Sequence, residues 1–210
     1  MNPFDLLADE TCDVDDFVLL DTAEPARKLY HCPFKIVACT NEGIPYRFTG
    51  MVTDKSEGEL PIIVDVVRKP LYLMAKRTIE LPHKGKSFVK GLADYSIDGL
   101  EEEIQVERKS KEDLFGTLGG RRDDFEAEIA RIGQCKVAAV VIEAEWTEIF
   151  QDPPGYSRLP PKVVSRTILS WSQRYPNVHW FTCAGRQHAE NLVFRMLEMF
   201  WRRREHDQGN

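Results

Sequence analysis

The order of segments in this chain predicts one α/β domain, built on a mixed central β-sheet flanked by helices, with a β-rich extension at the N-terminus. Strand-like runs of β-branched and apolar residues dominate between residues 34 and 67. Further strand patterns follow, and from residue 111 helical segments alternate with them. Helices that alternate with strands pack on both faces of one sheet, and 210 residues suffice for one well-buried domain.

The first third of the chain is predicted to be an acidic extension followed by short strands. FKIVACT and YRFTGMVTD, separated by NEGIP, predict a hairpin or a pair of neighbouring strands. PIIVDVV is a short β-branched run with one acid, Asp65, which is typical of a strand buried on both faces. We therefore expect an extension with a β-hairpin in residues 1–60, a main domain in 61–204 and a disordered tail in 205–210.

The rest of the chain predicts alternating helices and strands. In EIQVERKS the apolar residues face one side of a strand, whereas Glu107 and Lys109 face the other. Residues 111–132 predict helix, KVAAVVIEAEW a continuous buried strand, and QDPPGYSRLPP a surface loop. A last strand, NVHWFTCAG, lies between helices predicted at Lys162–Gln173 and His188–Trp201.

Composition and charge exclude several classes of protein. Hydrophobic residues make up 42% and charged residues 30%, with a net charge of -6, so any nucleic acid must be met by a local basic patch. Five scattered cysteines lack zinc or disulfide spacing and indicate free thiols in a reducing compartment. No signal peptide or membrane-spanning stretch is present. We expect a protein that is not secreted, has no membrane partner, and is cytoplasmic or nucleoid-associated in a prokaryote or nuclear in a eukaryote.

The charged end of EIQVERKS is the strongest candidate for chemistry. Glu107 and Lys109 share one face of the strand, toward the loop that presents Asp94. Two carboxylates of this kind hold a hard divalent cation, which stabilises a phosphodiester undergoing attack and lowers the pKa of a bound water. The lysine would position or polarise that water. The alternative is an ordinary ion pair at the end of a strand, because E-x-K pairs are common.

The combined motifs resemble the nuclease domain of the XPF family of structure-specific endonucleases. The resemblance covers about residues 61–203 and is carried by ADYSI, VERKSKEDL, GRRDDFEAEIARI and AVVIEAE, with VERKxxxD as its most specific part. It implies a restriction-endonuclease-like fold and Mg²⁺- or Mn²⁺-dependent hydrolysis of branched or flapped DNA, a DNA-repair activity. It further implies that Asp65, Asp94 and Glu107 are catalytic metal ligands and that Lys109 is the water-positioning base or an electrostatic stabiliser.

Other residues match the family pattern in accessory roles. Arg108 would orient the site or contact DNA, and Asp113 matches the final acid of the motif. Asp113 could equally be a carboxylate that interacts with the dipole of the following helix. Glu143 matches a further acid, either as an outer partner of the metal ligands or as a strand-end residue in contact with solvent.

Basic residues near these motifs are candidates for binding DNA. Arg121 and Arg122 follow a glycine pair at the start of a helix, where phosphate binding is favoured, although a solvated helix start has the same pattern. Lys84 and Lys86 lie in the stretch before Asp94, which is either a basic loop that follows the DNA backbone or an ordinary exposed loop.

The chain departs from the family pattern at two places. Asp65-Val66-Val67-Arg68 stands where the family has D-x-R-E, so a cation replaces a glutamate, and Ala93-Asp94 replaces G-D. We predict an active endonuclease. The alternative is an inactive XPF-like domain that serves as a DNA-binding or dimerisation partner, which Arg68 would favour by pairing with Asp65. A general α/β scaffold without a nucleic-acid role would require Asp94 to point away from Glu107.

The last helix also predicts an oligomer. Its apolar residues, among them Met196, Met199, Phe200 and Trp201, form a surface wider than one core face needs. We therefore expect a homodimer or heterodimer through this domain.

Overall fold

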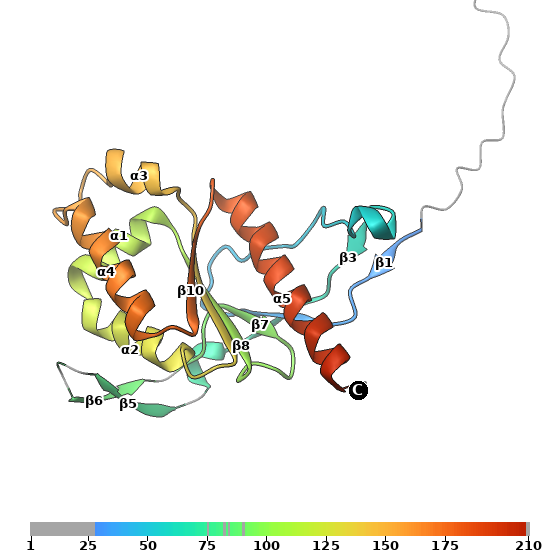
Figure 1. Cartoon of the computed structure of the whole chain (residues 1–210), viewed down its shortest axis with the longest axis horizontal. Coiled ribbons are helices and arrows are strands. Elements are labelled where there is room, and N and C mark those ends of the chain that lie inside the picture. Colours follow the sequence, from blue (N-terminus) through green and yellow to red (C-terminus); the bar gives the residue numbers. More distant parts are fainter. Residues whose placement is uncertain (1–27, 75, 82, 84, 90, 209–210) are drawn as a thin grey trace, which may run out of the picture.

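The centre of the fold is a mixed six-stranded sheet with helices on both faces, as Figure 1 shows for the computed structural model. The structure describes residues 28–208 except 75, 82, 84 and 90. In spatial order the strands are β10 (Val178–Thr182), β9 (Val137–Ile142), β8 (Ile104–Lys109), β7 (Tyr95–Ile97), β2 (Ile36–Cys39) and β4 (Val66–Lys69). Only β7 is antiparallel to its neighbours, so the other five strands run in one direction. The predicted fold class is confirmed.

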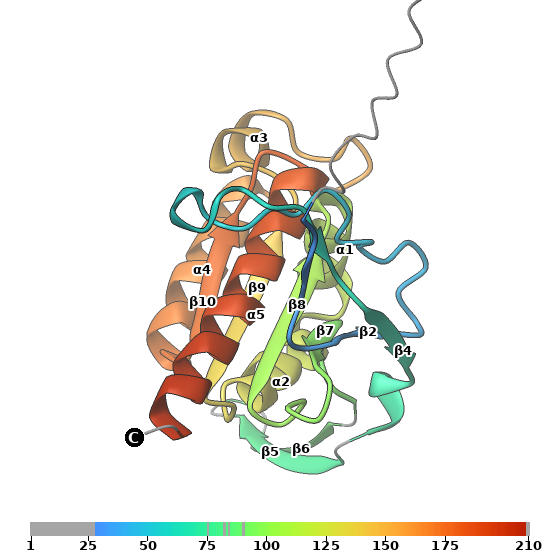
Figure 2. The ribbon, with the colours of Figure 1, turned by 90° about the vertical axis from the view of Figure 1, so that its right-hand side faces the viewer.

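The central strands carry apolar residues on both faces of the sheet, so helices pack on both faces. One face carries α1 (Lys111–Gly120), α2 (Arg122–Ile132) and α4 (Pro161–Arg174), which pack on Val140 and its neighbours. The other face carries α5 (Arg186–Gln208), which packs on Val141. The short helix α3 (Trp146–Gln151) follows the end of β9 (Figure 2). Each fully buried apolar side chain contributes roughly 1.5–3 kcal/mol relative to exposure.

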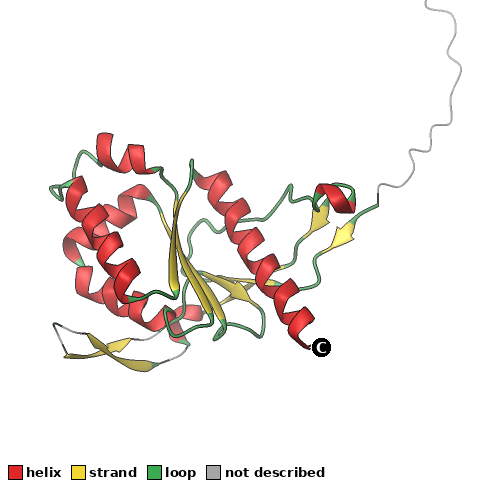
Figure 3. Ribbon diagram, in the orientation of Figure 1, coloured by secondary structure: helices red, strands yellow, loops and turns green. Residues whose placement is uncertain are grey.

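Two small sheets lie outside the main one (Figure 3). The first pairs β1 (Tyr30–His31) with β3 (Ile62–Ile63), and the second is the hairpin β5 (Arg77–Leu81) and β6 (Gly85–Val89). Two 3-10 turns, η1 (Lys55–Glu57) and η2 (Leu71–Leu73), complete the described elements. The hairpin packs its buried residues on Ala127 of α2.

Parts of the segment from residue 30 to residue 63 pack against α5 (Figure 1). The ring of Phe34 lies 5.6 Å from that of Trp201, and Met51 packs in the same cluster. Glu57 accepts two hydrogen bonds from Arg202, at 2.9 and 3.1 Å. Most of the broad apolar surface of α5 is therefore buried within this chain, although Met199 is 70% exposed. The surface that motivated the predicted dimer is largely occupied.

Three predictions for the first third of the chain differ from the structure: one boundary, one strand pairing and one strand. The boundary after residue 60 does not separate an extension from the sheet, because β2 is an interior strand. The segment YRFTGMVTD does not pair with β2, whose neighbours are β4 and β7. PIIVDVV is divided between β3 and the edge strand β4 at the exposed Asp65, so it is not one strand buried on both faces.

The expected tail is helical as far as Gln208, and residues 209 and 210 lie outside the described part. Helix-favouring residues and an ion pair of 3.0 Å between Arg202 and Glu198 extend α5. No helix in the described part of the chain is long and apolar enough to cross a membrane.

Candidate active site

The charged residues at the end of β8 point to opposite faces of the sheet. Glu107 and Lys109 face α1 and α2, whereas Arg108 faces α5, because side chains alternate along a strand. Five strands run in the same direction, so their carboxyl ends meet at one edge of the sheet. We call this the carboxyl edge. It is where parallel sheets place their binding sites.

Asp94 reaches the carboxyl edge because it comes just before the antiparallel strand β7. Its carboxylate accepts a hydrogen bond of 2.9 Å from the backbone N–H of Arg108, and its carbonyl accepts one of 2.8 Å from Cys39. The preceding Gly91 has a φ of +91°, and a Cβ there would lie 2.9 Å from the backbone of Tyr72. The loop therefore depends on this glycine. It holds Asp94 beside Glu107. Asp94 therefore does not point away from Glu107, as a general α/β scaffold without a nucleic-acid role would require.

Lys109 is a buried cation among carboxylates. Its Nζ lies 2.9 Å from Glu107 Oε1 and 3.0 Å from Asp113 Oδ2, and 4.8 Å from the centre of the Phe125 ring. Burial by itself lowers the pKa of Lys109, but the charges of Glu107 and Asp113 raise it above its ordinary value. The neighbours of Lys109 therefore favour its protonated form, which suits the stabilisation of negative charge.

Asp113 connects this cluster to the first turn of α1. Its backbone N–H donates to the side chain of Ser110, which caps the helix, at 3.1 Å. One carboxylate oxygen accepts from Thr117 at 3.3 Å and the other pairs with Lys109. Asp113 therefore has both of the roles that the sequence left open for it: a carboxylate at a helix N-terminus and a member of the cluster.

Two acids near Lys109 have raised pKa values. Burial, and then the charge of Glu107, raises the pKa of Asp94 well above its ordinary range. The same two causes raise the pKa of Glu128, on α2, from 4.5 to about 7. Glu128 lies in GRRDDFEAEIARI, one turn after the buried Phe125, and the sequence analysis assigned it no role. Burial and the charge of Glu107 therefore oppose the ionised forms of Asp94 and Glu128.

The donor set decides whether a divalent cation fits here. A cation between Asp94 and Glu107 would relieve the repulsion between them. Mg²⁺ commonly uses one or two carboxylates and keeps several waters, and Mn²⁺ has similar ligand preferences. Within the described residues, no group of three His, Cys, Asp or Glu side chains is placed to hold a metal. The residues fit one largely hydrated ion, and not a site enclosed by protein ligands.

On the other face of β8, Arg108 forms a completed ion network. Its guanidinium donates to both carboxylate oxygens of Glu143, each at 2.8 Å, and to Glu42 at 2.7 Å. Tyr46 also donates to Glu143, at 2.8 Å. Burial raises the pKa of Glu143, but these hydrogen bonds outweigh it and leave the pKa below its ordinary value. Arg108 is therefore placed to orient the strand end, and its guanidinium is already engaged.

Glu42 is a residue of this edge that the sequence analysis missed. It follows β2, which runs parallel to β4 and in the same direction as β8, so the ends of these strands meet. The available signal was an acid soon after the first β-rich run.

The structure does not bring Asp65 into the cluster. Asp65 precedes β4, which runs toward the carboxyl edge, so Asp65 lies at the opposite edge, where its carbonyl accepts from Ile36 at 2.9 Å. The four residues of β4 add about 13 Å of strand between the two edges. Asp65 is therefore too far from Asp94 and Glu107 to bind the same metal ion, in contrast to the prediction from the sequence. Arg68 donates to the carbonyl oxygen of Glu42 at 2.8 Å, and so reaches the backbone beside the site.

The predicted DNA-binding residues are dispersed. Arg121 is exposed and lies 3.9 Å from Asp113, whereas Arg122 donates to Thr167 and packs over a tryptophan ring. Lys86 belongs to β6, opposite Glu80, in the hairpin that packs on α2, and so is not in a loop beside the cluster. Lys84 lies outside the described residues.

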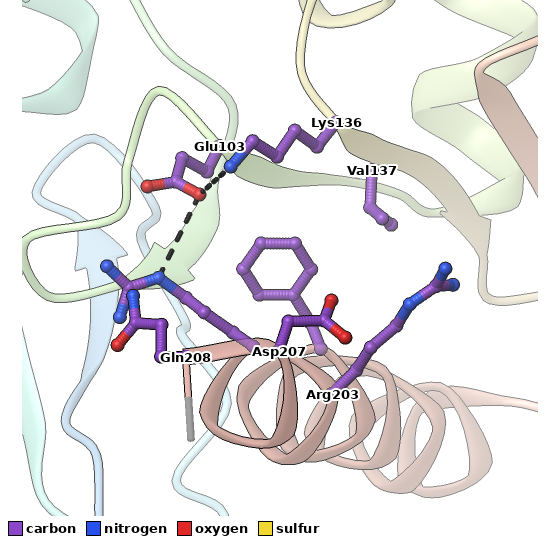
Figure 4. Close-up of a pocket in the computed structure, with 8 residues that line it drawn as sticks. Glu103, Lys136, Val137, Arg203, Asp207 and Gln208 are labelled. Atoms are coloured by element: carbon purple, nitrogen blue, oxygen red, sulfur yellow. Dashed lines mark hydrogen bonds and ion pairs between the residues drawn. The ribbon is translucent and has the colours of Figure 1, made fainter. Parts of the chain in front are cut away.

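A cavity in the described structure lies at the opposite edge of the sheet from the cluster. It has a volume of about 510 Å³ and lies between the starts of β8 and β9 and the last turns of α5 (Figure 4). Glu103 pairs there with Lys136 at 2.7 Å and with Arg204 at 4.0 Å. This cavity is separate from the Asp94, Glu107 and Lys109 cluster.

No family model and no curated protein matches the chain in sequence. Among solved structures, XPF from Aeropyrum pernix matches 83% of this chain and 69% of its own, with a TM-score of 0.51 and 16% identity. XPF from Aeropyrum pernix in complex with DNA matches 81% of this chain and 66% of its own, with a TM-score of 0.49 and 15% identity. The chain therefore has the restriction-endonuclease-like fold of an XPF nuclease, as the resemblance in sequence implied.

Proposed function

We propose that this chain is a Mg²⁺- or Mn²⁺-dependent DNA endonuclease that hydrolyses phosphodiester bonds in branched or flapped DNA. The observation that supports this most is the position of Asp94 and Glu107 beside the protonated Lys109, at the carboxyl edge of an XPF-like fold. Neighbouring carboxylates that oppose each other's ionisation, as Asp94 and Glu107 do, are typical of a site that binds a cation.

The roles follow from the contacts of each residue. Asp94 and Glu107 would hold the ion, which supplies Lewis-acid stabilisation of the phosphate and a more acidic bound water. Lys109, kept protonated by its neighbours, stabilises the negative charge that builds on the phosphate during hydrolysis. Arg108 holds Asp94 through its backbone N–H, while its side chain is fixed by Glu42 and Glu143.

The test is cleavage of labelled flap, fork and linear duplex DNA with Mg²⁺, Mn²⁺ or a chelator. We expect Asp94→Asn, Glu107→Gln and Lys109→Ala each to lower the rate by roughly 100-fold or more, since each removes a preorganised charge. Asp65→Asn is the matched control, because it makes the same change in an acid at the opposite edge. Full activity of Asp65→Asn supports the proposed ligand pair, and loss of activity would return Asp65 to the site.

The second candidate function is that of an inactive XPF-like partner that binds DNA or dimerises. The cysteine at position 39, where an acid would strengthen the metal site, favours it. DNA binding by folded protein without cleavage under any metal would support this alternative. Sedimentation at high concentration tests the predicted homodimer, and a monomer throughout would refute it. A heterodimer would be tested by mixing with an active relative.

A further inference from the structure

The solvent face of α1 carries a groove that the proposed active site does not use. Gly116 and Gly119 are exposed on this face, and nothing lies within 4 Å of where a Cβ would stand at either. Two shallow hollows of about 390 and 380 Å³ meet at Gly119, one reaching toward Tyr156 and the other toward Arg121. We call these two hollows together the α1 groove. Another molecule could approach the helix backbone closely here, since no side chains block it.

Tyr156 forms one wall of the groove and is fixed in place although it is 68% exposed. Its hydroxyl donates to the carbonyl oxygen of Glu112, at 3.1 Å, in the first turn of α1. An ion pair of 2.7 Å between Lys111 and Asp152 holds the same loop against the helix. A tyrosine tethered by its hydroxyl leaves its ring face open to solvent, which is the arrangement of a platform for stacking.

An arginine lies at each end of the groove, and Asp123 and Asp124 also line the hollow that contains Arg121. Arg158 lines the hollow beside Tyr156, is exposed, and forms no ion pair or hydrogen bond with the described residues. Arg121 lines the other hollow and is 68% exposed. Two arginines that flank an exposed aromatic ring match the charge and the π-surface of a nucleic-acid strand.

A chain of contacts connects the groove to the catalytic cluster. Arg121 lies 3.9 Å from one carboxylate oxygen of Asp113, whose other oxygen lies 3.0 Å from Lys109. A strand lying in the groove would therefore lead to the phosphate position beside Lys109.

We infer that the α1 groove binds an unpaired segment of the DNA substrate, with a base stacked on Tyr156 and phosphates held by Arg158 and Arg121. Bases in a duplex are stacked on each other and cannot stack on the tyrosine, so the groove selects DNA with a single-stranded part beside the cleavage point. This inference rests on the proposed function for its substrate class, but binding can be measured without cleavage.

The test is fluorescence anisotropy with a labelled oligothymidine and a duplex of equal length, in chelator so that no cleavage occurs. We expect Tyr156→Ala to weaken binding of the single strand by roughly 5- to 100-fold and binding of the duplex by less than about twofold. Arg158→Ala should weaken both and lower the salt dependence by about one counterion. Arg203→Ala is the matched control, because this arginine lies in the cavity at the opposite edge of the sheet (Figure 4).

A second variant guards against a folding defect. Gly119→Leu fills the groove at a helical position, where leucine is a better helix former than glycine, so the melting temperature should be equal or higher. Weaker single-strand binding by this variant supports the inference. Unchanged single-strand affinity in both Tyr156→Ala and Gly119→Leu, or no binding of the oligothymidine by the unmodified protein, overturns it.

The two proposals fail in different ways. Loss of single-strand binding in the groove variants, with no cleavage by any form of the protein, supports the groove and refutes the proposed nuclease activity. If Tyr156→Ala cleaves flap DNA and duplex DNA at the same rates as the unmodified protein does, the nuclease activity is supported and the proposed role of the groove is refuted.

Discussion

The two faces of β8 carry opposite electrostatics, although the residues involved are consecutive. On the α5 face, Arg108 satisfies Glu143, whose pKa lies below its ordinary value because hydrogen bonds outweigh the effect of burial. On the other face, the pKa values of Asp94 and Glu128 are raised by burial and by the charge of Glu107. The comparison shows that one face is a completed network that fixes the strand end. On the other face, which we call incomplete, burial and the charge of Glu107 oppose the ionisation of two acids.

The completed network predicts the largest effect on stability. Arg108→Ala leaves the partly buried carboxylates of Glu42 and Glu143 without their main partner, so the free energy of unfolding should fall by up to about 3 kcal/mol. Urea unfolding measures this. Arg122→Ala is the control, since that arginine packs on a tryptophan without pairing with these acids. A loss below about 1 kcal/mol for Arg108→Ala would show that its ion network contributes little.

The incomplete face predicts that a divalent cation stabilises the protein. Saturating Mg²⁺ or Mn²⁺ should raise the melting temperature of the unmodified protein, since a ligand at one hundred times its Kd stabilises by about 2.7 kcal/mol. Asp94→Asn removes one of the two carboxylates and should abolish the shift, whereas Asp65→Asn should retain it. An equal shift in all three proteins would indicate nonspecific binding of the ion elsewhere.

Local patterns were sufficient to predict the cluster itself. The alternation along EIQVERKS determines which side chains share a face, and the short connection to the antiparallel β7 brings Asp94 to the same edge. Both pieces of information lie within about fifteen residues of sequence, from Asp94 to Lys109. In the structure, Asp94 lies against the backbone of Arg108, and Lys109 pairs with Glu107.

The strand pairing between distant segments was not predictable in this way. Whether Asp65 or Glu42 reaches the carboxyl edge depends on the order and direction of β2 and β4, which no local pattern specifies. The apolar breadth of α5 likewise indicated that something covers it, but not that residues 30–63 of the same chain do so. In both cases the missing information was a long-range contact.

Glu128 gives the most selective test of the incomplete face, with the smallest expected effect. An acid whose folded pKa is raised from 4.5 to about 7 destabilises the fold as it ionises, so this cost grows between these pH values and stays constant above them. Glu128→Gln cannot ionise, and should therefore stabilise the metal-free protein by about 1–2 kcal/mol at pH 8 and by nothing near pH 4.5. Thermal unfolding across this pH range measures the difference. A gain that does not change with pH would assign the effect to packing, and a loss at pH 8 would mean that the Glu128 carboxylate is stabilised by its neighbours, contrary to the contrast between the two faces of β8.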